Sequence, residues 1–184
     1  MRVLAISGSL RRDSYNTKLL RAAEELLPPT VEVEYFEELE SVPPYNEDRD
    51  TDEAPLGAAY LRDRIAAADA LLIATPEYNA SIPGQLKNAV DWASRPVRAG
   101  VLWGRPVVVV GASTGMYGAV WAQAELRKSL SVAGARVVDA EVVVGRAHQR
   151  FDEEGRLVDQ EMRDELTEAL GALMAEASTR LIAA

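Results

Sequence analysis

Cysteine is absent from the sequence, and histidine occurs once, as His148. The missing cysteine excludes disulfides, thiol catalysis, thiolate zinc sites and cysteine-held iron–sulfur clusters. The single histidine excludes multi-histidine metal sites. The acidic run at residues 47–53 lacks the spacing of a calcium loop and is expected to be a solvated loop, so no metal site is predicted. Any redox chemistry therefore needs an electron-handling group that the protein binds.

Basic residues are also fewer than acidic ones. Lys and Arg number 20 against 29 Asp and Glu, which gives a formal net charge of −9. This balance argues against a sequence-independent nucleic-acid binder and against docking to an anionic membrane. No apolar run approaches the length of a membrane span, and the apolar stretch at residues 3–6 is too short for a signal peptide. We expect a cytoplasmic protein with neither a nucleic-acid nor a membrane partner.

Short apolar runs alternate with amphipathic segments along the chain, a pattern typical of βα units. Strands are expected near residues 3–6, 31–35, 70–74, 107–110 and 136–144, and helices near residues 19–27, 56–68, 83–92, 119–132 and from 159 onward. The uniformly apolar run at 70–74 predicts a central strand, whereas the alternation at 31–35 predicts an edge strand. Right-handed crossovers then predict one α/β domain over residues 1–184: a three-layer sandwich around a five-stranded parallel sheet in the order 2-1-3-4-5.

Ligands of such sheets bind beyond the carboxyl ends of the strands. The loops at residues 7–16, 75–81 and 111–118 are therefore expected to form one site. Two of these loops carry informative residues, and each also has a plainer interpretation.

The first loop precedes a helix, whose N-terminal N–H groups and dipole favour a phosphate. Hydroxyl, amide and guanidinium groups are concentrated there: Ser9, Arg11, Arg12, Ser14, Asn16 and Thr17. The plainer interpretation is a βα turn capped by Ser14 or Asp13 with solvated arginines. The loop is neither a Walker A motif nor a G-x-G-x-x-G fingerprint.

The second loop is stiffened by Pro76 and Pro83. A rigid turn there can aim the N–H groups of Glu77, Tyr78 and Asn79 at the polar edge of a flat heterocycle, with Tyr78 over one face. Taken alone, this loop is better explained as an ordinary surface turn followed by a capped helix. The combination of the two loops at one edge favours a ligand with both a phosphate and an aromatic ring.

Several segments resemble the NADPH-dependent FMN reductase family, including its quinone, azo-dye and chromate reductases. The resemblance is carried by residues 8–16, the run Pro76-Glu77-Tyr78-Asn79 that continues to Trp92, residues 111–113 and residues 151–155. It implies a flavodoxin-like fold that binds FMN non-covalently, NADPH or NADH as electron donor, and a homodimer or homotetramer. Relatives often carry a second glycine where this chain has Ala112.

The resemblance also implies which residues hold FMN. The phosphate is expected to bind to the first loop, at Ser9, Leu10, Arg11, Arg12, Asp13, Ser14, Tyr15 and Asn16. The ring is expected to contact two further groups of residues. One is Pro76, Glu77, Tyr78 and Asn79, and the other is Ser113, Thr114 and Gly115.

The expected activity is hydride transfer from NAD(P)H through FMN to quinones or similar acceptors, extending to chromate, azo compounds or free flavin. No catalytic side chain is predicted, because the cofactor performs the chemistry. The alternative is a flavodoxin-type electron carrier with no small-molecule substrate of its own, a role that the acidic charge suits equally well.

Overall fold

The structure is a computed structural model that describes residues 1–183. The helices and strands along the chain are β1 (Arg2–Ser7), α1 (Tyr15–Leu26), β2 (Glu32–Phe36), α2 (Leu56–Ala67), β3 (Ala70–Ala74), α3 (Gly84–Ala93), β4 (Pro106–Ala112), α4 (Val120–Val132), β5 (Arg136–Val137), β6 (Val143–Val144) and α5 (Gln160–Ala183). Short 3₁₀ turns occur at Leu39–Ser41, Glu47–Arg49 and Ala147–Gln149. No helix within these residues is both long and apolar enough to cross a membrane.

The strands form a parallel sheet in the order β2-β1-β3-β4-β5, with β6 paired to the far end of β4. Every residue of β3 and β4 is buried, whereas β2 at the edge has only Phe36 buried. Central parallel strands are covered on both faces, which explains their uninterrupted apolar runs. The predicted flavodoxin-like fold and strand order are confirmed.

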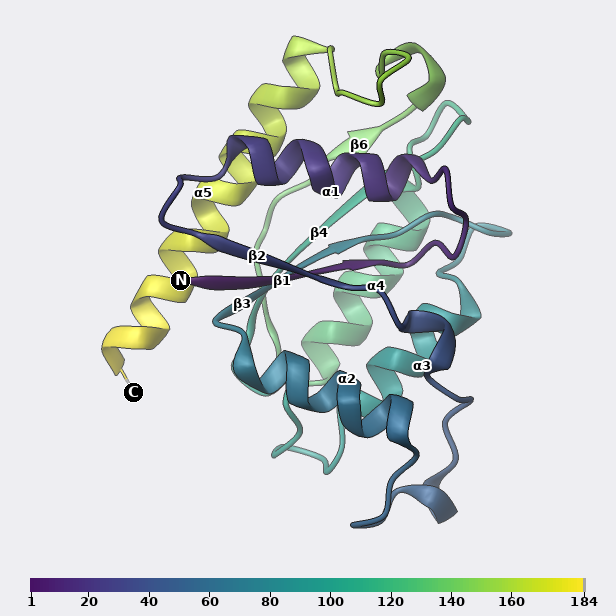
Figure 1. The fold of residues 1–184 in the computed structure, drawn as a ribbon, viewed down its shortest axis with the longest axis vertical. Helices are drawn as coiled ribbons and strands as arrows, with labels where there is room; N and C mark the ends of the chain where they lie inside the picture. The colour runs from purple at the N-terminus through teal and green to yellow at the C-terminus, as the bar shows by residue number, and fades with distance from the viewer. Residues whose placement is uncertain (184) are drawn as a thin grey trace.

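Helices cover both faces of the sheet and create two apolar cores (Figure 1). Leu19 of α1 and Leu166 of α5 pack on one face. Leu61 of α2, Leu86 of α3 and Leu126 of α4 pack on the other. The three layers leave the loops at the carboxyl ends of the strands uncovered, which is where a ligand site is expected.

The strand expected over residues 136–144 is wrong in its middle, since only β5 and β6 pair with β4. Side chains of α4 reach the carbonyls between these two pieces. Arg127 Nη1 donates to the carbonyl of Ala140 at 2.6 Å, and Gln123 Nε2 donates to that of Val142 at 3.1 Å. The carbonyl of Val142 also accepts from the N–H of Gly111 in β4 at 3.1 Å, so the ladder resumes there, and Arg127 gives the carbonyl of Ala140 a donor outside the sheet.

Candidate functional site

The first two loops leave the sheet side by side. Ser7 at the end of β1 pairs with Ala74 of β3, and Ala74 pairs with Val110 of β4. The N–H of Gly8 donates to the carbonyl of Ala74 at 2.8 Å. A Cβ on Gly8 would lie 2.7 Å from Leu86 Cδ2 of α3 and 3.2 Å from Pro76 Cδ of the second loop, so glycine permits this close approach.

The loop between β1 and α1 presents hydroxyl and N–H groups in one place. Ser14 is the N-cap of α1, and its Oγ accepts from the N–H of Asn16 at 3.2 Å. Ser9 is buried, and its Oγ accepts from the N–H of Arg11 at 3.4 Å. The N–H groups of Tyr15 and Thr17 have no protein acceptor within the described part of the chain. Such a helix start is ready to bind an anion.

Asn16 joins this loop to the end of β4. Its side-chain Nδ2 donates to the carbonyl of Ala112, and its Oδ1 accepts from the N–H of Ala112, both at 3.0 Å. Asn16 is buried, so the pair is shielded from water. Its oxygen and one amide proton are thus engaged in positioning β4 relative to α1, and the second amide proton is left for a ligand.

Asp13 turns outward from the same loop. Its carboxylate lies 2.5 Å from Lys18 Nζ. The hydrogen bond and charge of Lys18 lower the pKa of Asp13 below the usual value for aspartate. Asp13 is therefore ionised at neutral pH and contributes loop structure rather than a proton.

The loop between β3 and α3 contains a tight two-residue turn. Tyr78 and Ser81 exchange backbone hydrogen bonds of 3.1 Å, and both Asn79 and Ala80 have positive φ, 54° and 58°. These are features of a type I′ turn. Because Ser81 takes the N–H of Tyr78, that N–H does not face a ring edge, contrary to the sequence-based expectation.

Two carboxylates fasten this second loop to α4. Oε2 of Glu77 accepts from the N–H groups of Trp121 and Ala122 at 3.0 Å each. The N-cap residue Ala119 has no side chain that could do so, and Glu77 therefore caps the helix from a distant loop. Glu125 adds a second tie through a 2.6 Å hydrogen bond from the hydroxyl of Ser81.

The third loop, between β4 and α4, is held by β6 and the segment after it. The N–H of Ser113 donates to Val144 at 3.0 Å, and the N–H of Arg146 donates to the carbonyl of Gly115 at 2.7 Å. The N–H of Gly115 donates to the hydroxyl of Ser113 at 3.1 Å. Thr114, between them, is exposed.

Together the three loops enclose a cleft of about 140 Å³, here called the rim cleft. It is lined by ten of the predicted residues and by Ala112: Ser9, Arg11, Ser14, Tyr15, Asn16, Pro76, Glu77, Tyr78, Ala112, Ser113 and Thr114. The other predicted residues lie outside it. Leu10 and Arg12 line a neighbouring cleft, whereas Asp13, Asn79 and Gly115 line neither.

The sequence interpretation missed a group of exposed apolar side chains on the third loop and α4. Met116, Tyr117 and Trp121 are 62%, 58% and 48% exposed. The rings of Tyr117 and Trp121 meet edge to face with centroids 5.0 Å apart. The available signal was the spacing of two aromatic residues around the start of a helix, next to a glycine-rich loop.

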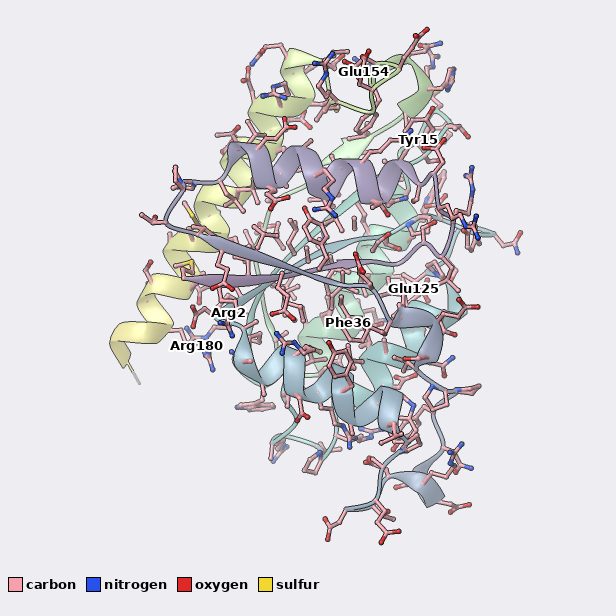
Figure 2. The ribbon with its side chains drawn as sticks, in the orientation of Figure 1. Arg2, Tyr15, Phe36, Glu125, Glu154 and Arg180 are labelled. Carbon is pink, nitrogen blue, oxygen red and sulfur yellow. The ribbon has the colours of Figure 1, made fainter. Side chains whose placement is uncertain are left out.

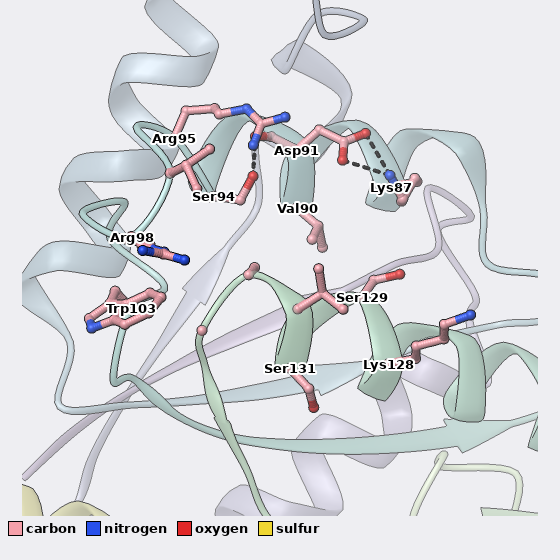
Figure 3. A pocket seen from close by; sticks show the side chains of 14 residues that line it. Lys87, Val90, Asp91, Ser94, Arg95, Arg98, Trp103, Lys128, Ser129 and Ser131 are labelled. Carbon is pink, nitrogen blue, oxygen red and sulfur yellow. Dashed lines mark hydrogen bonds and ion pairs between the residues drawn. The ribbon is translucent and has the colours of Figure 1, made fainter.

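A wider groove of about 620 Å³ lies between α3 and α4 and shares no residue with the rim cleft (Figure 3). Lys87 pairs there with Asp91 at 2.6 Å. Val97, Trp103 and Val132 bring exposed apolar surface to it. This groove is distinct from the site formed by the three loops.

A family model described as NADPH-dependent FMN reductase matches residues 1–149. An NAD(P)H-dependent FMN reductase of Pseudomonas aeruginosa is 42% identical over 94% of this chain and 93% of its own. A 2-hydroxy-1,4-benzoquinone reductase of a Burkholderia species is 37% identical over 89% of this chain and 88% of its own. Among solved structures, FerB, a flavoenzyme NAD(P)H:(acceptor) oxidoreductase of Paracoccus denitrificans, superposes with a TM-score of 0.86 at 34% identity, covering 97% of both chains. The chain therefore belongs to the NADPH-dependent FMN reductase family.

Proposed function

We propose that this protein binds FMN in the rim cleft and uses NAD(P)H to reduce quinones and similar acceptors, a range that includes chromate, azo compounds and free flavin. The observation that carries the proposal is the meeting of the three loops in one cleft, with anion-ready groups on one side and Tyr78 on another. The names of the relatives, which include flavin and quinone reductases, support the same activity.

The residues of the rim cleft fit FMN chemically. Its phosphate would be held by the hydroxyls of Ser9 and Ser14, the guanidinium of Arg11 and the open N–H groups of Tyr15 and Thr17. Its ring would rest between the Pro76–Asn79 loop and the Ser113–Gly115 loop. Bound FMN supplies the hydride and electron chemistry.

The protein's own residues bind and orient. Asn16 holds the first loop against β4, and Glu77 holds the second loop against α4. Neither contact depends on a proton that moves during turnover. His148, the one histidine, is exposed in the Ala147–Gln149 turn and does not line the cleft. In this proposal the chemistry is supplied by the cofactor, and no side chain is assigned a catalytic role.

The test is titration of the purified protein with FMN, followed by anaerobic addition of NADPH and then a soluble quinone. We expect a yellow complex that NADPH bleaches and the quinone restores with many turnovers. A protein that stays colourless with excess FMN would refute the proposal. Bleaching without quinone turnover, but with one-electron exchange to protein partners, would identify an electron carrier instead.

A substitution of Ser14 tests where the phosphate binds. Ser14→Asp keeps a good N-cap for α1 but places a negative charge beside the phosphate. We expect the Kd for FMN to rise by at least about tenfold from charge repulsion, with unchanged thermal stability. Ser178→Asp on the exposed side of α5 is the matched control and should leave the Kd unchanged. Equal affinities in both variants would place the phosphate elsewhere.

We also propose a homodimer or homotetramer in which a second copy of the chain covers the groove between α3 and α4. The support is the exposed apolar surface of Val97, Trp103 and Val132, which are 67%, 51% and 81% exposed along one groove (Figure 3). Apolar side chains gathered in this way are typical of protein interfaces. Light scattering should give a mass of two or four chains, and Val132→Glu should lower it. A monomer at micromolar concentration would refute this assembly.

A further inference from the structure

A tight turn between β6 and α5, here called the 151–157 turn, packs against the first loop without lining the rim cleft. Phe151 and Leu157 pair across it as an antiparallel bridge. Within it the N–H of Gly155 donates to the carbonyl of Asp152 at 3.0 Å. The turn contains the last of the segments that carry the family resemblance, and the proposed function leaves it without a role.

The 151–157 turn is fixed to parts of the chain other than α1. Ahead of it, the N–H of Phe151 donates to the carbonyl of Ala147 at 3.2 Å. Behind it, the guanidinium of Arg150 pairs with the carboxylate of Asp159, which also accepts from the N–H of Met162 at 3.1 Å in the first turn of α5. The turn therefore has supports that are separate from α1.

Two contacts join this turn to the start of α1, and Tyr15 and Glu154 lie toward the same end of the molecule (Figure 2). The ring of Phe151 lies against the ring of Tyr15, with centroids 5.4 Å apart. The backbone of Gly155, at a φ of 81°, lies against the aliphatic chain of Lys18, since a Cβ there would be 3.2 Å from Lys18 Cε. Lys18 places its Nζ 5.0 Å from the centroid of the Tyr15 ring, within the range of a cation–π contact. The turn thus holds Tyr15 both directly and through Lys18.

The ring that the turn contacts belongs to the helix start assigned to the phosphate. Tyr15 is the first residue of α1 and lines the rim cleft, and its N–H is open, as is that of Thr17. The first hydrogen bond along α1 runs from the N–H of Lys18 to the carbonyl of Ser14 at 3.0 Å, so the donors ahead of it are not fixed by the helix itself. Helix ends fray unless other groups hold them. Donors that are ordered in advance bind an anion more tightly, because their ordering costs nothing at the binding step.

We propose that Phe151 is a positioning residue: it holds Tyr15, and with it the open N–H groups at the start of α1, in the arrangement that receives the phosphate of FMN. The inference rests on the proposed binding of FMN in the rim cleft. Phe151 does not line that cleft and therefore acts through Tyr15. It lies beyond residues 1–149, which the family model matches, so the support of the site extends past the matched part of the chain.

The test compares FMN with riboflavin, which has the same ring and no phosphate. Phe151→Leu keeps a buried apolar side chain but removes the ring that contacts Tyr15. The Kd for FMN should rise by about fivefold, because the helix start must then be ordered during binding, and the Kd for riboflavin should change by less than about twofold. Titration of the flavin-free protein, followed by quenching of flavin fluorescence, measures both constants. An equal rise for the two flavins, or no rise for FMN, would overturn the proposal.

Ile65→Val is the matched control for a loss of core packing. Ile65 belongs to α2 in the core on the other face of the sheet, is buried, and does not line the rim cleft. The loss of one buried carbon should lower Tm by a few degrees and leave both Kd values within about twofold of the wild type. A selective rise in the Kd for FMN in this variant as well would overturn the proposal, because reduced stability alone would then explain the effect.

Hydrogen exchange tests the same contact without any flavin. The amide of Lys18, which makes the first hydrogen bond of α1, should exchange about fivefold faster in Phe151→Leu than in the wild type, and within about twofold of the wild type in Ile65→Val. Equal exchange in the wild type and in Phe151→Leu would overturn the positioning role whether or not FMN binds. A wild type that binds no FMN would refute the proposed function, and the exchange rate would still decide whether Phe151 orders the helix start.

Discussion

Arginine is used differently at the two ends of the sheet. At the amino ends of the strands, Arg105 is buried and donates to the carbonyls of Ala68 and Ala66. At the carboxyl ends, Arg11 and Arg12 are exposed and form no salt bridge within residues 1–183. Burial lowers the pKa of Arg105 to about 10. The same type of side chain thus supports the structure at one end of the sheet and is open to ligands at the other.

The wider surroundings follow the same division. Arg2 and Arg180 lie at the amino end of the sheet, and Tyr15 and Glu125 lie toward the carboxyl end (Figure 2). At the amino end, the N–H of Arg2 donates to the carboxylate of Asp69 at 2.8 Å. At the amino end Arg2 and Arg105 make hydrogen bonds that involve the backbone, although the Nε of each is buried without a partner, whereas at the carboxyl end Arg11 and Arg12 are exposed. A structural and a binding role can therefore be separated by mutation.

The largest effect on stability is expected at the amino end. Arg105→Met replaces the guanidinium with an apolar chain and leaves the carbonyls of Ala68 and Ala66 without this donor. We expect a loss of about 2 kcal/mol in the free energy of unfolding, since unsatisfied buried polar groups cost about 1–3 kcal/mol. Urea unfolding of the wild type and the variant measures this loss. Arg12→Met should change stability by less than about 0.5 kcal/mol, and comparable losses in both would remove the contrast between the two ends.

An intermediate effect is expected where the second loop meets α4. Glu77→Ala removes the acceptor for the N–H groups of Trp121 and Ala122. A lost helix cap costs about 1 kcal/mol. Glu77→Gln keeps an acceptor oxygen, so we expect it to lower the free energy of unfolding by less. Glu125→Ala should also lose less, because its contact with backbone is a single 3.3 Å bond from the N–H of Ile82. Urea unfolding of all three variants tests this order, which equal losses would contradict.

The smallest effect is expected from the exposed ion pair of the first loop. Because Lys18 lowers the pKa of Asp13, the pair favours the folded state above the ordinary pKa of aspartate. That contribution is lost as the pH falls through the lowered pKa of the folded protein. Carbon-13 NMR of the Asp13 carboxyl should show a higher pKa in Lys18→Met than in the wild type. Identical titration curves would show that Lys18 has no influence.

Much of the fold follows from local patterns. The uniformly apolar runs of β3 and β4 can be predicted because central parallel strands are buried on both faces. The alternation at β2 predicts an edge strand for the complementary reason. The break between β5 and β6 could not be predicted from local pattern, since the donors that meet its carbonyls, Arg127 and Gln123 of α4, lie more than ten residues away along the chain.

The site was predictable as a set of loops and less so as a set of contacts. Loop composition indicated that residues such as Ser9, Ser14 and Pro76 come together, and they line one cleft. The N–H of Tyr78 was predicted to face a ring but belongs to a turn. Backbone partners of this kind depend on dihedral angles that residue type alone does not specify.

Periodicity and composition were sufficient for the order of strands and helices and for the placement of polar loops after β1, β3 and β4, because both depend on which faces of nearby segments avoid water. Only the tertiary structure assigned individual side chains. It turned Asn16 toward Ala112 and Glu77 toward α4, and it placed Arg12 on a cleft next to the rim cleft. These choices depend on groups that are distant along the chain and meet only when the sheet brings their loops together.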